Sequence, residues 1–363
     1  VHLIALSFAD GLEAEGVTQH AVPLAKGPSG KGRLAFAAAA EDIVGRLGLD
    51  VVHDTGCGWA CDVFQPHGGS RRASARQNLL LLPRVLRPWK RQIARWTPRY
   101  REFERLLTKQ YVQDGRLFVA LSKMVQRDFV ELHGVPEENI RLVYNGVDVR
   151  RFSPAARTPF RDLMRARLGV RDDEVLSVIV AHDWALKGVS TLLSAHEPLR
   201  AAGLPSHVVV VGGKPQAARS AVVTSEGATV HYAGPVDDAV PYYAAADAYI
   251  HPTFYDPCSL VVLEALACGL PVVTSRFNGA GELVTPGVQG ALVNDPANGA
   301  ELAAAMRPLF DESRRMTMGA AARRLAEAHT LARNCDEIAA VYEEAAARKG
   351  NVRSSAAPMR RAG

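Results

Sequence analysis

Residues 252–272 read PTFYDPCSLVVLEALACGLPV and place two carboxylates, Asp256 and Glu264, on either side of seven residues. An aspartate followed by a proline predicts a helix start at Asp256, because Asp caps free N–H groups and Pro suits the first helical position. The segment Gly269-Leu-Pro271 predicts that this helix ends near Cys268, and a short buried strand is expected over 272–274. A helix followed by a buried strand is typical of a parallel α/β sheet.

The spacing of the two carboxylates indicates a type of ligand. Eight helical residues at about 1.5 Å each would place Glu264 roughly 12 Å along the axis from Asp256. This is about the distance between the sugar and the ribose of a nucleotide-sugar laid across the helix start. The diphosphate between them would lie at the helix N-terminus, where free N–H groups and the helix dipole favour anions.

This pattern resembles the Glu-x7-Glu motif of the retaining family-4 glycosyltransferases, with Asp256 where that family usually has its first Glu. Other segments occur in the family's order, and the resemblance covers most of residues 50–345. It is greatest to bacterial lipopolysaccharide-core glucosyltransferases. The segments that carry it are Tyr144-Asn-Gly-Val-Asp148, Asp183-Trp-Ala-Leu-Lys-Gly-Val189, Gly213-Lys-Pro215, Tyr243-Ala-Ala-Ala-Asp247 and His251-Pro252.

The resemblance implies an α/β GT-B fold, with two Rossmann-like domains facing a cleft. Residues 1–152 are expected to form the acceptor-side domain and 153–325 the nucleotide-sugar-binding domain. A helix over 326–348 would cross back to the first domain, and 349–363 would be a disordered tail. Because Val1 is followed at once by strand-like residues, we expect the first domain to lack the family's opening strand, glycine-rich loop and helix.

Composition agrees with two domains and sets limits on the class of protein. The chain has 363 residues, of which 48% are hydrophobic, enough for two buried cores. Five cysteines form no Cys-x-x-Cys pair and their odd number argues against a disulfide framework. No apolar run of spanning length and no signal-peptide pattern is present. We therefore expect a cytoplasmic protein.

Donor-binding residues are expected at the start of the helix that follows Asp256 and at two glycine-containing turns, Lys187-Gly188 and Gly212-Gly213. By resemblance, Glu264 would bind the ribose hydroxyls and Lys187 the diphosphate. An arginine that the family commonly has just before this lysine is missing here. A solvated loop lysine and a plain tight turn at Gly212-Gly213 remain alternatives. The full set of expected donor-binding residues is Glu264, Lys187, Gly213, Lys214, Pro257, Cys258, Ser259, Leu260 and His182.

Three residues are expected to act in the chemistry. Asp256 would position the sugar hydroxyls, although it could be only a helix cap. Lys187 would stabilise the leaving phosphate together with the helix N-terminus. His67, at a strand end beside Gly68-Gly69, is the candidate on the acceptor side, with a backbone-bonded loop histidine as the alternative. No Asp-x-Asp triplet occurs in the sequence, so no metal and no cofactor are expected.

Residues 84–105 are rich in arginine and carry Trp89, Ile93, Trp96, Tyr100 and Phe103 at helical spacing. Pro98 interrupts the pattern, so two short helices are possible. An apolar face packed on its own domain is one interpretation, and nucleic acid is another, but no recognition motif supports it. We favour an anionic membrane surface, because Trp prefers the interface and each Lys or Arg adds about 1 kcal/mol.

The sequence thus predicts a retaining hexosyltransferase that moves a sugar, from a UDP-hexose, to a lipid-linked, lipopolysaccharide or oligosaccharide acceptor. It would be peripheral on the inner face of the cell membrane. In retaining members of the family the departing phosphate is thought to help deprotonate the acceptor. Two alternatives remain: a nucleotide-sugar epimerase on the same scaffold, and a degenerate sugar-nucleotide-binding protein without turnover.

Overall fold

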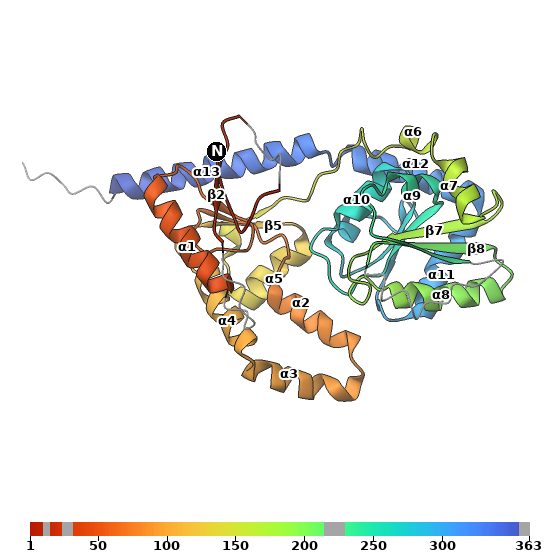
Figure 1. Ribbon diagram of the computed structural model, residues 1–363, viewed down its shortest axis with the longest axis horizontal. Helices are drawn as coiled ribbons and strands as arrows, with labels where there is room; N and C mark the ends of the chain where they lie inside the picture. The colour runs from red at the N-terminus through yellow and green to blue at the C-terminus, as the bar shows by residue number, and fades with distance from the viewer. Residues whose placement is uncertain (10–14, 24–31, 214–228, 356–363) are drawn as a thin grey trace, which may run out of the picture.

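The computed structural model describes residues 1–9, 15–23, 32–213 and 229–355, with side chains as far as 350, and has the expected α/β architecture (Figure 1). Its first domain contains β1 (His2–Ala5), β2 (Thr18–Ala21), α1 (Gly32–Leu47), β3 (His53–Asp54), β4 (Val63–Phe64), α2 (Arg71–Asn78), α3 (Arg87–Trp96), α4 (Pro98–Gln110), β5 (Leu117–Ala120), α5 (Lys123–His133) and β6 (Ile140–Leu142).

The remaining elements form the second domain and a long C-terminal helix. They are α6 (Pro154–Arg157), α7 (Arg161–Leu168), β7 (Val175–Val180), α8 (Val189–Ala201), β8 (Ser206–Val211), β9 (Val230–Gly234), α9 (Val240–Ala245), β10 (Ala248–His251), α10 (Leu260–Ala267), β11 (Val272–Ser275), β12 (Gly290–Val293), α11 (Gly299–Met306), α12 (Glu312–Glu327) and α13 (Leu331–Ser355).

Each domain is built on a parallel sheet. In the first domain the strand order is β3-β4-β5-β6, and β1 and β2 form a separate parallel pair. In the second domain the order is β12-β11-β10-β7-β8-β9, again all parallel. Parallel strands need crossover connections, which the helices between them supply.

The second sheet is apolar on both faces, as expected of a parallel sheet covered by helices. Along β8, Val208 and Val210 pack into one core cluster, and Val209 and Val211 pack into the other. Side chains alternate across a strand, so consecutive valines serve opposite faces. One cluster includes residues of α10 and α12, and the other includes residues of α8 and α11.

Helix α13 runs from the second domain along the first (Figure 1). Its Val341 and Ala345 are buried in the same cluster as Val63 and Leu117 of the first sheet. The Tyr342 hydroxyl lies 2.7 Å from Nδ1 of His53. The helix extends to Ser355, so the prediction of a disordered tail from Lys349 is wrong as far as that residue; 356–363 lie outside the described residues.

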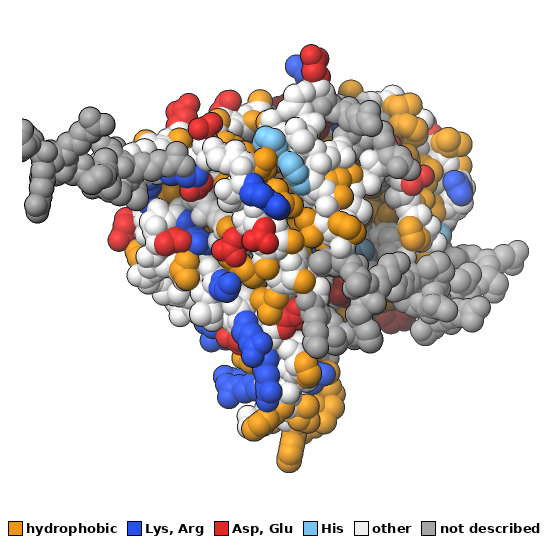
Figure 2. Space-filling model, turned by 60° about the vertical axis from the view of Figure 1, so that its left-hand side comes forward, with side chains coloured by type: hydrophobic (Ala, Val, Ile, Leu, Met, Phe, Trp, Pro, Cys, Tyr) orange, Lys and Arg blue, Asp and Glu red, His pale blue; other side chains and the backbone are white. Residues whose placement is uncertain are grey.

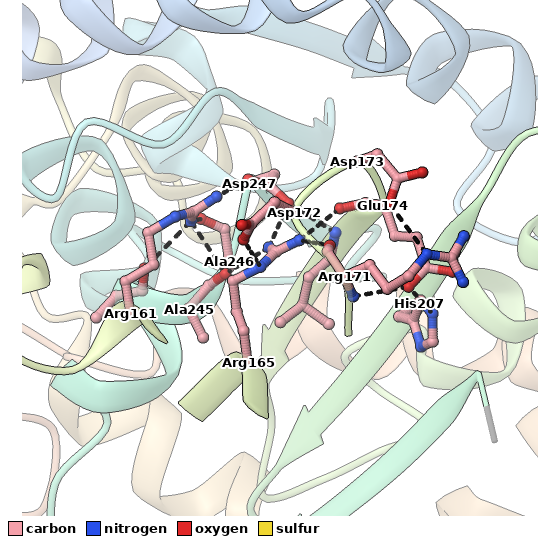
Figure 3. A network of polar contacts seen from close by, with 12 residues as sticks. Arg161, Arg165, Arg171, Asp172, Asp173, Glu174, His207, Ala245, Ala246 and Asp247 are labelled. Carbon is pink, nitrogen blue, oxygen red and sulfur yellow. Dashed lines mark hydrogen bonds and ion pairs between the residues drawn. The ribbon is translucent and has the colours of Figure 1, made fainter. Parts of the chain in front are cut away.

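A buried ionic network fixes the amino edge of the second sheet (Figure 3). Arg165 of α7 is 1% exposed, and its Nη1 lies 2.9 Å from Oδ2 of Asp247, just before β10. Arg161, one turn earlier, contacts Oδ1 of the same carboxylate at 2.7 Å. The Asp247 carboxylate also accepts a hydrogen bond from the Leu176 N–H of β7. The network therefore ties α7 to two adjacent strands, at the edge opposite the site described below.

Candidate donor site

The topology of the second sheet identifies where a ligand would bind. Strands β7 and β10 are neighbours, but the chain continues from β7 towards β8 on one side and from β10 towards β11 on the other. In open α/β sheets, ligands bind outside the carboxyl ends of the strands where the order reverses. The loop after β7 carries Lys187, and the segment after β10 carries Asp256.

The structure brings Lys187 and Asp256 together. The ammonium Nζ of Lys187 lies 2.6 Å from Oδ2 of Asp256, and their side chains are only 16% and 11% exposed. Gly188, with φ of +75°, allows this approach, because a Cβ at that position would overlap the carbonyl oxygen of Pro252. The Lys-Gly pair is therefore part of a loop packed tightly against the end of β10, and Lys187 is not a freely solvated lysine.

Two further buried residues, Tyr249 and His251, form a chain of polar contacts that ends at the Asp256 carboxylate. Tyr249 Oη lies 3.0 Å from Nδ1 of His251, and the other ring nitrogen of His251 lies 3.7 Å from Oδ2 of Asp256. Burial raises the pKa of Asp256, but the His251 ring and the Lys187 ammonium outweigh it and hold that pKa at about 2. Asp256 is therefore ionised at neutral pH. Neither Tyr249 nor His251 was expected at the site, although a histidine at a strand end indicates such a role.

The predicted helix start at Asp256 is wrong. Helix α10 begins at Leu260 with Ser259 as its N-cap. Asp256 instead forms an isolated parallel bridge with Asn278, and the Asp256 N–H donates to the Phe277 carbonyl. This pairing holds the backbone out of the helix, so the helical rise does not measure the separation of Asp256 from Glu264. The predicted helix end is confirmed, with Cys268 as C-cap and Gly269 at φ of +72°.

The N-terminus of α10 has the properties of an anion site. The side chain of Ser259 makes no capping hydrogen bond. The Ser259 N–H donates to Oδ1 of Asn278, and the first-turn N–H groups that follow have no intrahelical partner. Together with the helix dipole these groups favour negative charge. The strand predicted over 272–274 is present as β11 and lies directly behind this helix.

Glu264 lies inside α10, as predicted, and its carboxylate has one internal donor. Oε2 accepts a hydrogen bond of 2.9 Å from the hydroxyl of Tyr243 in α9. Burial raises the pKa of Glu264, and the hydrogen bond from Tyr243 only partly offsets this. Tyr243 is thus a site residue that the sequence did not identify. Its position in the Tyr243-to-Asp247 segment of the family pattern was the only indication.

The other expected donor-binding residues fall into two groups. Pro257, Cys258, Ser259 and Leu260 form the entrance to α10, and Leu260 is exposed. Gly213, at φ of +83°, follows β8, and a Cβ there would overlap the ring of Trp184. His182 is exposed after β7. Lys214 lies outside the described residues.

The first domain meets the entrance of α10 through the loop that carries His67. His67 is exposed after β4. Two residues later, Gly69 has φ of +63°, and a Cβ there would lie 2.6 Å from the Tyr255 hydroxyl and 2.8 Å from Cγ of Pro257. The N–H of Ser70 donates to the Tyr255 hydroxyl at 2.9 Å. The loop that carries His67 therefore touches the residues on either side of Asp256.

A second contact between the domains uses a carboxylate as a helix cap. Glu282 accepts hydrogen bonds from the N–H groups of Lys123 and Met124, at 2.8 and 2.7 Å, in the first turn of α5. It also accepts one of 2.9 Å from the Tyr144 hydroxyl. Asn145 donates to the Cys258 carbonyl at 2.7 Å. These contacts hold the carboxyl edges of the two sheets against each other.

The basic segment forms a projecting pair of helices. Helices α3 and α4 meet at Thr97, which is extended, as the proline predicted. Trp89, Ile93 and Trp96 are 71%, 58% and 69% exposed, so this apolar face of α3 is not packed on its own domain. Figure 2 shows hydrophobic side chains at this lowest tip, with Lys and Arg beside them. The expectation that Phe103 shares this face is wrong, because Phe103 is half-buried beneath arginine side chains.

Neither a metal-binding cluster nor a membrane-spanning helix is found among the described residues. In the ranges given above, no three His, Cys, Asp or Glu side chains are grouped as a metal site would require. Over the same ranges, none of the helices combines the length and apolar character needed to cross a bilayer.

Comparison with known proteins assigns both domains. Residues 1–151 match the family described as Glycosyltransferase Family 4, and residues 174–312 match Glycosyl transferases group 1. The chain is 33% identical over 254 residues to a D-inositol 3-phosphate glycosyltransferase of Geodermatophilus obscurus, covering 66% of this chain and 54% of that protein. A protein of the same name from Salinispora arenicola is 32% identical over 260 residues, covering 67% and 58%. The chain thus spans little more than half the length of these relatives.

Solved structures show the same fold. WaaG, a glycosyltransferase involved in lipopolysaccharide biosynthesis, superimposes with a TM-score of 0.71 at 21% identity, covering 95% of this chain and 90% of WaaG. Anabaena Alr3699/HepE in complex with UDP superimposes with a TM-score of 0.54 at 26% identity, covering 63% of this chain and 64% of that protein. The architecture of the chain is therefore the GT-B arrangement of two Rossmann-like domains.

Proposed function

Because the chain contains a Glycosyltransferase Family 4 domain and a Glycosyl transferases group 1 domain, we propose that it transfers a hexose from UDP-hexose to an acceptor hydroxyl with retention of configuration. The observation that carries this proposal is the Lys187–Asp256 ion pair of 2.6 Å beside the N-terminus of α10, at the switch point of the second sheet. A cation, an ionised acid and unpaired helix N–H groups suit a sugar diphosphate.

Each part of the donor has a proposed partner. The N–H groups at the start of α10 and the Lys187 ammonium would hold the diphosphate, and Glu264 would accept hydrogen bonds from the ribose hydroxyls. Asp256 would orient the hydroxyl groups of the transferred sugar. Its pKa of about 2 keeps it a hydrogen-bond acceptor throughout the physiological range. Support from Tyr249 and His251 would restrict its side chain.

The reaction would break the bond between the anomeric carbon and the β-phosphate oxygen and form a bond from that carbon to the acceptor oxygen. Negative charge then develops on the diphosphate, where Lys187 and the α10 N-terminus would stabilise it. The acceptor proton would pass to the departing phosphate, as the resemblance to retaining enzymes implies. We propose that no metal takes part, because fixed positive charge is already present at this point.

The acceptor would bind on the first-domain side. In support of this, His67 lies on the loop that contacts Tyr255 and Pro257 through Gly69, and these two residues flank Asp256. A lipid-linked, lipopolysaccharide or oligosaccharide acceptor agrees with the resemblance to WaaG. The related inositol 3-phosphate glycosyltransferases are named for a phosphorylated acceptor.

We further propose that α3 attaches the protein to the cytoplasmic face of an anionic membrane. Its exposed Trp89, Ile93 and Trp96 would enter the interface, and the arginines beside them would pair with lipid headgroups. Such a position would bring the acceptor-side loop close to a lipid-linked substrate.

Incubation of the full chain with a panel of nucleotide-sugars, with and without excess EDTA, tests the proposed activity. UDP-hexose should bind and be slowly hydrolysed, and hydrolysis should survive the chelator. Binding without turnover would favour a degenerate binding protein, and interconversion of the donor sugar would favour an epimerase. Loss of all turnover in EDTA, restored by Mn²⁺, would contradict the metal-independent reaction.

Liposome co-sedimentation tests the membrane proposal. The protein should bind anionic vesicles at low salt, bind neutral vesicles poorly, and be released at about 1 M salt, where the screening length is about 3 Å. A variant with Arg84, Arg87, Arg91 and Arg95 replaced by Gln should bind weakly. Equal partitioning of this variant and the wild type would contradict the proposal.

A further inference from the structure

Three arginine side chains from three different helices converge on one aromatic ring. The guanidinium carbons of Arg33 in α1, Arg71 in α2 and Arg99 in α4 lie 4.3, 5.0 and 5.9 Å from the centroid of the Phe103 ring. We call these three residues the arginine cluster. All three positive charges therefore lie within 5.9 Å of one point on the surface of the first domain.

The cluster has no acidic partner in the part of the chain that the structure describes. There, none of the three guanidinium groups forms an ion pair or a hydrogen bond with a protein group. The adjacent Arg72, by contrast, is paired with Glu104 at 2.8 Å. Partial burial and the nearby charge of Arg33 lower the pKa of Arg71. Cation–π contacts compensate weakly for three like charges in one place.

The location of the cluster connects it with the acceptor side of the site. Arg71 is the first residue of α2, whose first turn contains no acidic residue, so the helix dipole adds to the positive potential. Arg71 follows Gly69 by two residues, and Gly69 is packed against Tyr255 and Pro257 at the entrance of α10. The charges of Arg71 and Arg33 also act on Cys57, in the loop after β3. The cluster therefore lies at the carboxyl edge of the first sheet, beside the donor site.

We propose that Arg33, Arg71 and Arg99 bind a phosphate monoester carried by the acceptor, so that the substrate is a phosphorylated sugar or a phosphorylated glycolipid. This inference rests on the proposed transferase function, since it assigns a chemical group to the acceptor. A phosphate monoester carries between one and two negative charges at neutral pH and offers three acceptor oxygens. Guanidinium groups bind such oxygens in pairs, which suits arginine better than lysine for this site.

Calorimetric titration with glycerol 3-phosphate at constant ionic strength tests the proposal, with glycerol as the uncharged control. The wild type should bind the phosphate and not glycerol. Arg71→Gln should weaken binding about tenfold or more, as expected for loss of a hydrogen bond to a charged group, and the triple Gln variant should abolish it. Arg76→Gln, an exposed arginine on the same helix, is the matched control and should bind normally. Equal binding by the triple variant and the wild type would overturn the proposal, as would no binding by the wild type.

Thermal melting separates this role from a structural one. If the cluster exists to bind an anion, removing like charges relieves repulsion, and the triple Gln variant should melt at or above the wild-type temperature without phosphate. Added glycerol 3-phosphate should raise the melting temperature of the wild type and not that of the variant. A variant that melts well below the wild type but keeps its response to phosphate would show that the arginines only pack on Phe103, and would overturn the proposal.

Two additional arms identify the source of the phosphate and separate this inference from the donor site. Vesicles containing phosphatidic acid present a monoester headgroup, and vesicles of equal charge containing phosphatidylglycerol present a diester. Preference for phosphatidic acid that the triple variant loses supports a lipid-borne phosphate; binding of soluble glycerol 3-phosphate alone supports a phosphorylated sugar.

Lys187→Ala should keep glycerol 3-phosphate binding and lose UDP affinity, whereas the triple variant should do the opposite. Loss of both ligands in Lys187→Ala would place the phosphate at the donor site and overturn the proposal.

Discussion

Lys187 and Asp256, which are separated by sixty-nine positions in the chain, form an ion pair of 2.6 Å at the carboxyl ends of β7 and β10. Its two members come from loops on opposite sides of the point where the strand order reverses. The sequence identified both residues but not their contact. The pair links the local geometry to the proposed chemistry, because it holds a cation next to the uncapped N-terminus of α10.

The role of Glu264 can be tested by matching a side-chain change with a ligand change. Glu264→Gln should weaken UDP binding by about 1.5–3 kcal/mol, the range for hydrogen bonds to charged groups. It should have no effect on 2′,3′-dideoxy-UDP, which lacks the ribose hydroxyls. Glu197→Gln, on the exposed face of α8, serves as control and should bind both ligands normally. Equal weakening of both ligands by Glu264→Gln, measured by calorimetry, would exclude ribose as its partner.

The close approach of the two domains predicts a strong effect of one added methyl group. A Cβ at Gly279 would overlap the Pro257 carbonyl and the Ser122 side chain of the first domain. Gly279→Ala should therefore destabilise the protein by about 1–3 kcal/mol, as overpacking does, and should lower the melting temperature. Gly45→Ala, in α1 with nothing within contact distance, should be neutral or stabilising. Equal melting temperatures for Gly279→Ala and Gly45→Ala would contradict this packing.

The buried network at the amino edge should contribute mainly to stability. Asp247→Asn leaves the fully buried Arg165 with only the fully exposed Asp172, at 3.8 Å, as a counter-ion and should cost about 3–5 kcal/mol in unfolding free energy. Asp173→Asn removes a partner of Arg171 in a pair in which both side chains are largely exposed, and should cost less than about 1 kcal/mol. Denaturant titration of both variants measures the difference. Similar costs would mean that the Arg165–Asp247 pair is not the main contact there.

The contact between Tyr255 and Asp128 predicts a specific dependence on pH. Burial raises the pKa of Asp128 from 3.8 to about 6, although the Tyr255 hydroxyl donates to it at 3.1 Å. A raised pKa in the folded state means that folding favours the protonated form of Asp128. The stability that protonated Asp128 contributes is therefore fully present below the pKa of the unfolded state, and it is lost as the pH rises through about 6. Asp128→Asn keeps an acceptor for Tyr255 without the charge.

Near pH 8, Asp128→Asn should therefore increase the unfolding free energy by about 1 kcal/mol, after allowing for solvent screening, and raise the melting temperature accordingly. Near pH 4 it should change the melting temperature little. Melting curves across this range provide the measurement. A gain of the same size at both pH values, or a loss near pH 8, would contradict the raised pKa.

The sequence was sufficient for the parts of the fold that depend on local patterns. The helix end at Gly269 and the strand over Val272–Ser275 were predicted because positive φ and continuous apolar residues depend on the residues themselves. The start of this helix was not predicted correctly, because the pairing of Asp256 with the segment around Asn278 outweighs the preference of Asp256 for a helix cap.

The residues that make up the site were harder to predict than the fold, because they are brought together by contacts between residues far apart in the sequence. Glu282 accepts from the N–H of Met124 in α5, 158 positions away in the chain, and the Tyr243 hydroxyl donates to Glu264 from a neighbouring helix. No local pattern specifies either contact. In the same way, the sequence placed Phe103 on the apolar face of α3, whereas the helix break at Thr97 turns it towards α1 and α2.

The comparison of UDP with uridine in wild type and Lys187→Ala tests the central claim most directly. If Lys187 binds the donor diphosphate, the wild type should bind UDP far more tightly than uridine, and Lys187→Ala should reduce that ratio by about tenfold or more while leaving uridine affinity unchanged. Lys123→Ala, an exposed lysine of α5, should leave the ratio unchanged. A ratio in Lys187→Ala equal to that of the wild type would contradict the assignment of the diphosphate to the switch point between β7 and β10.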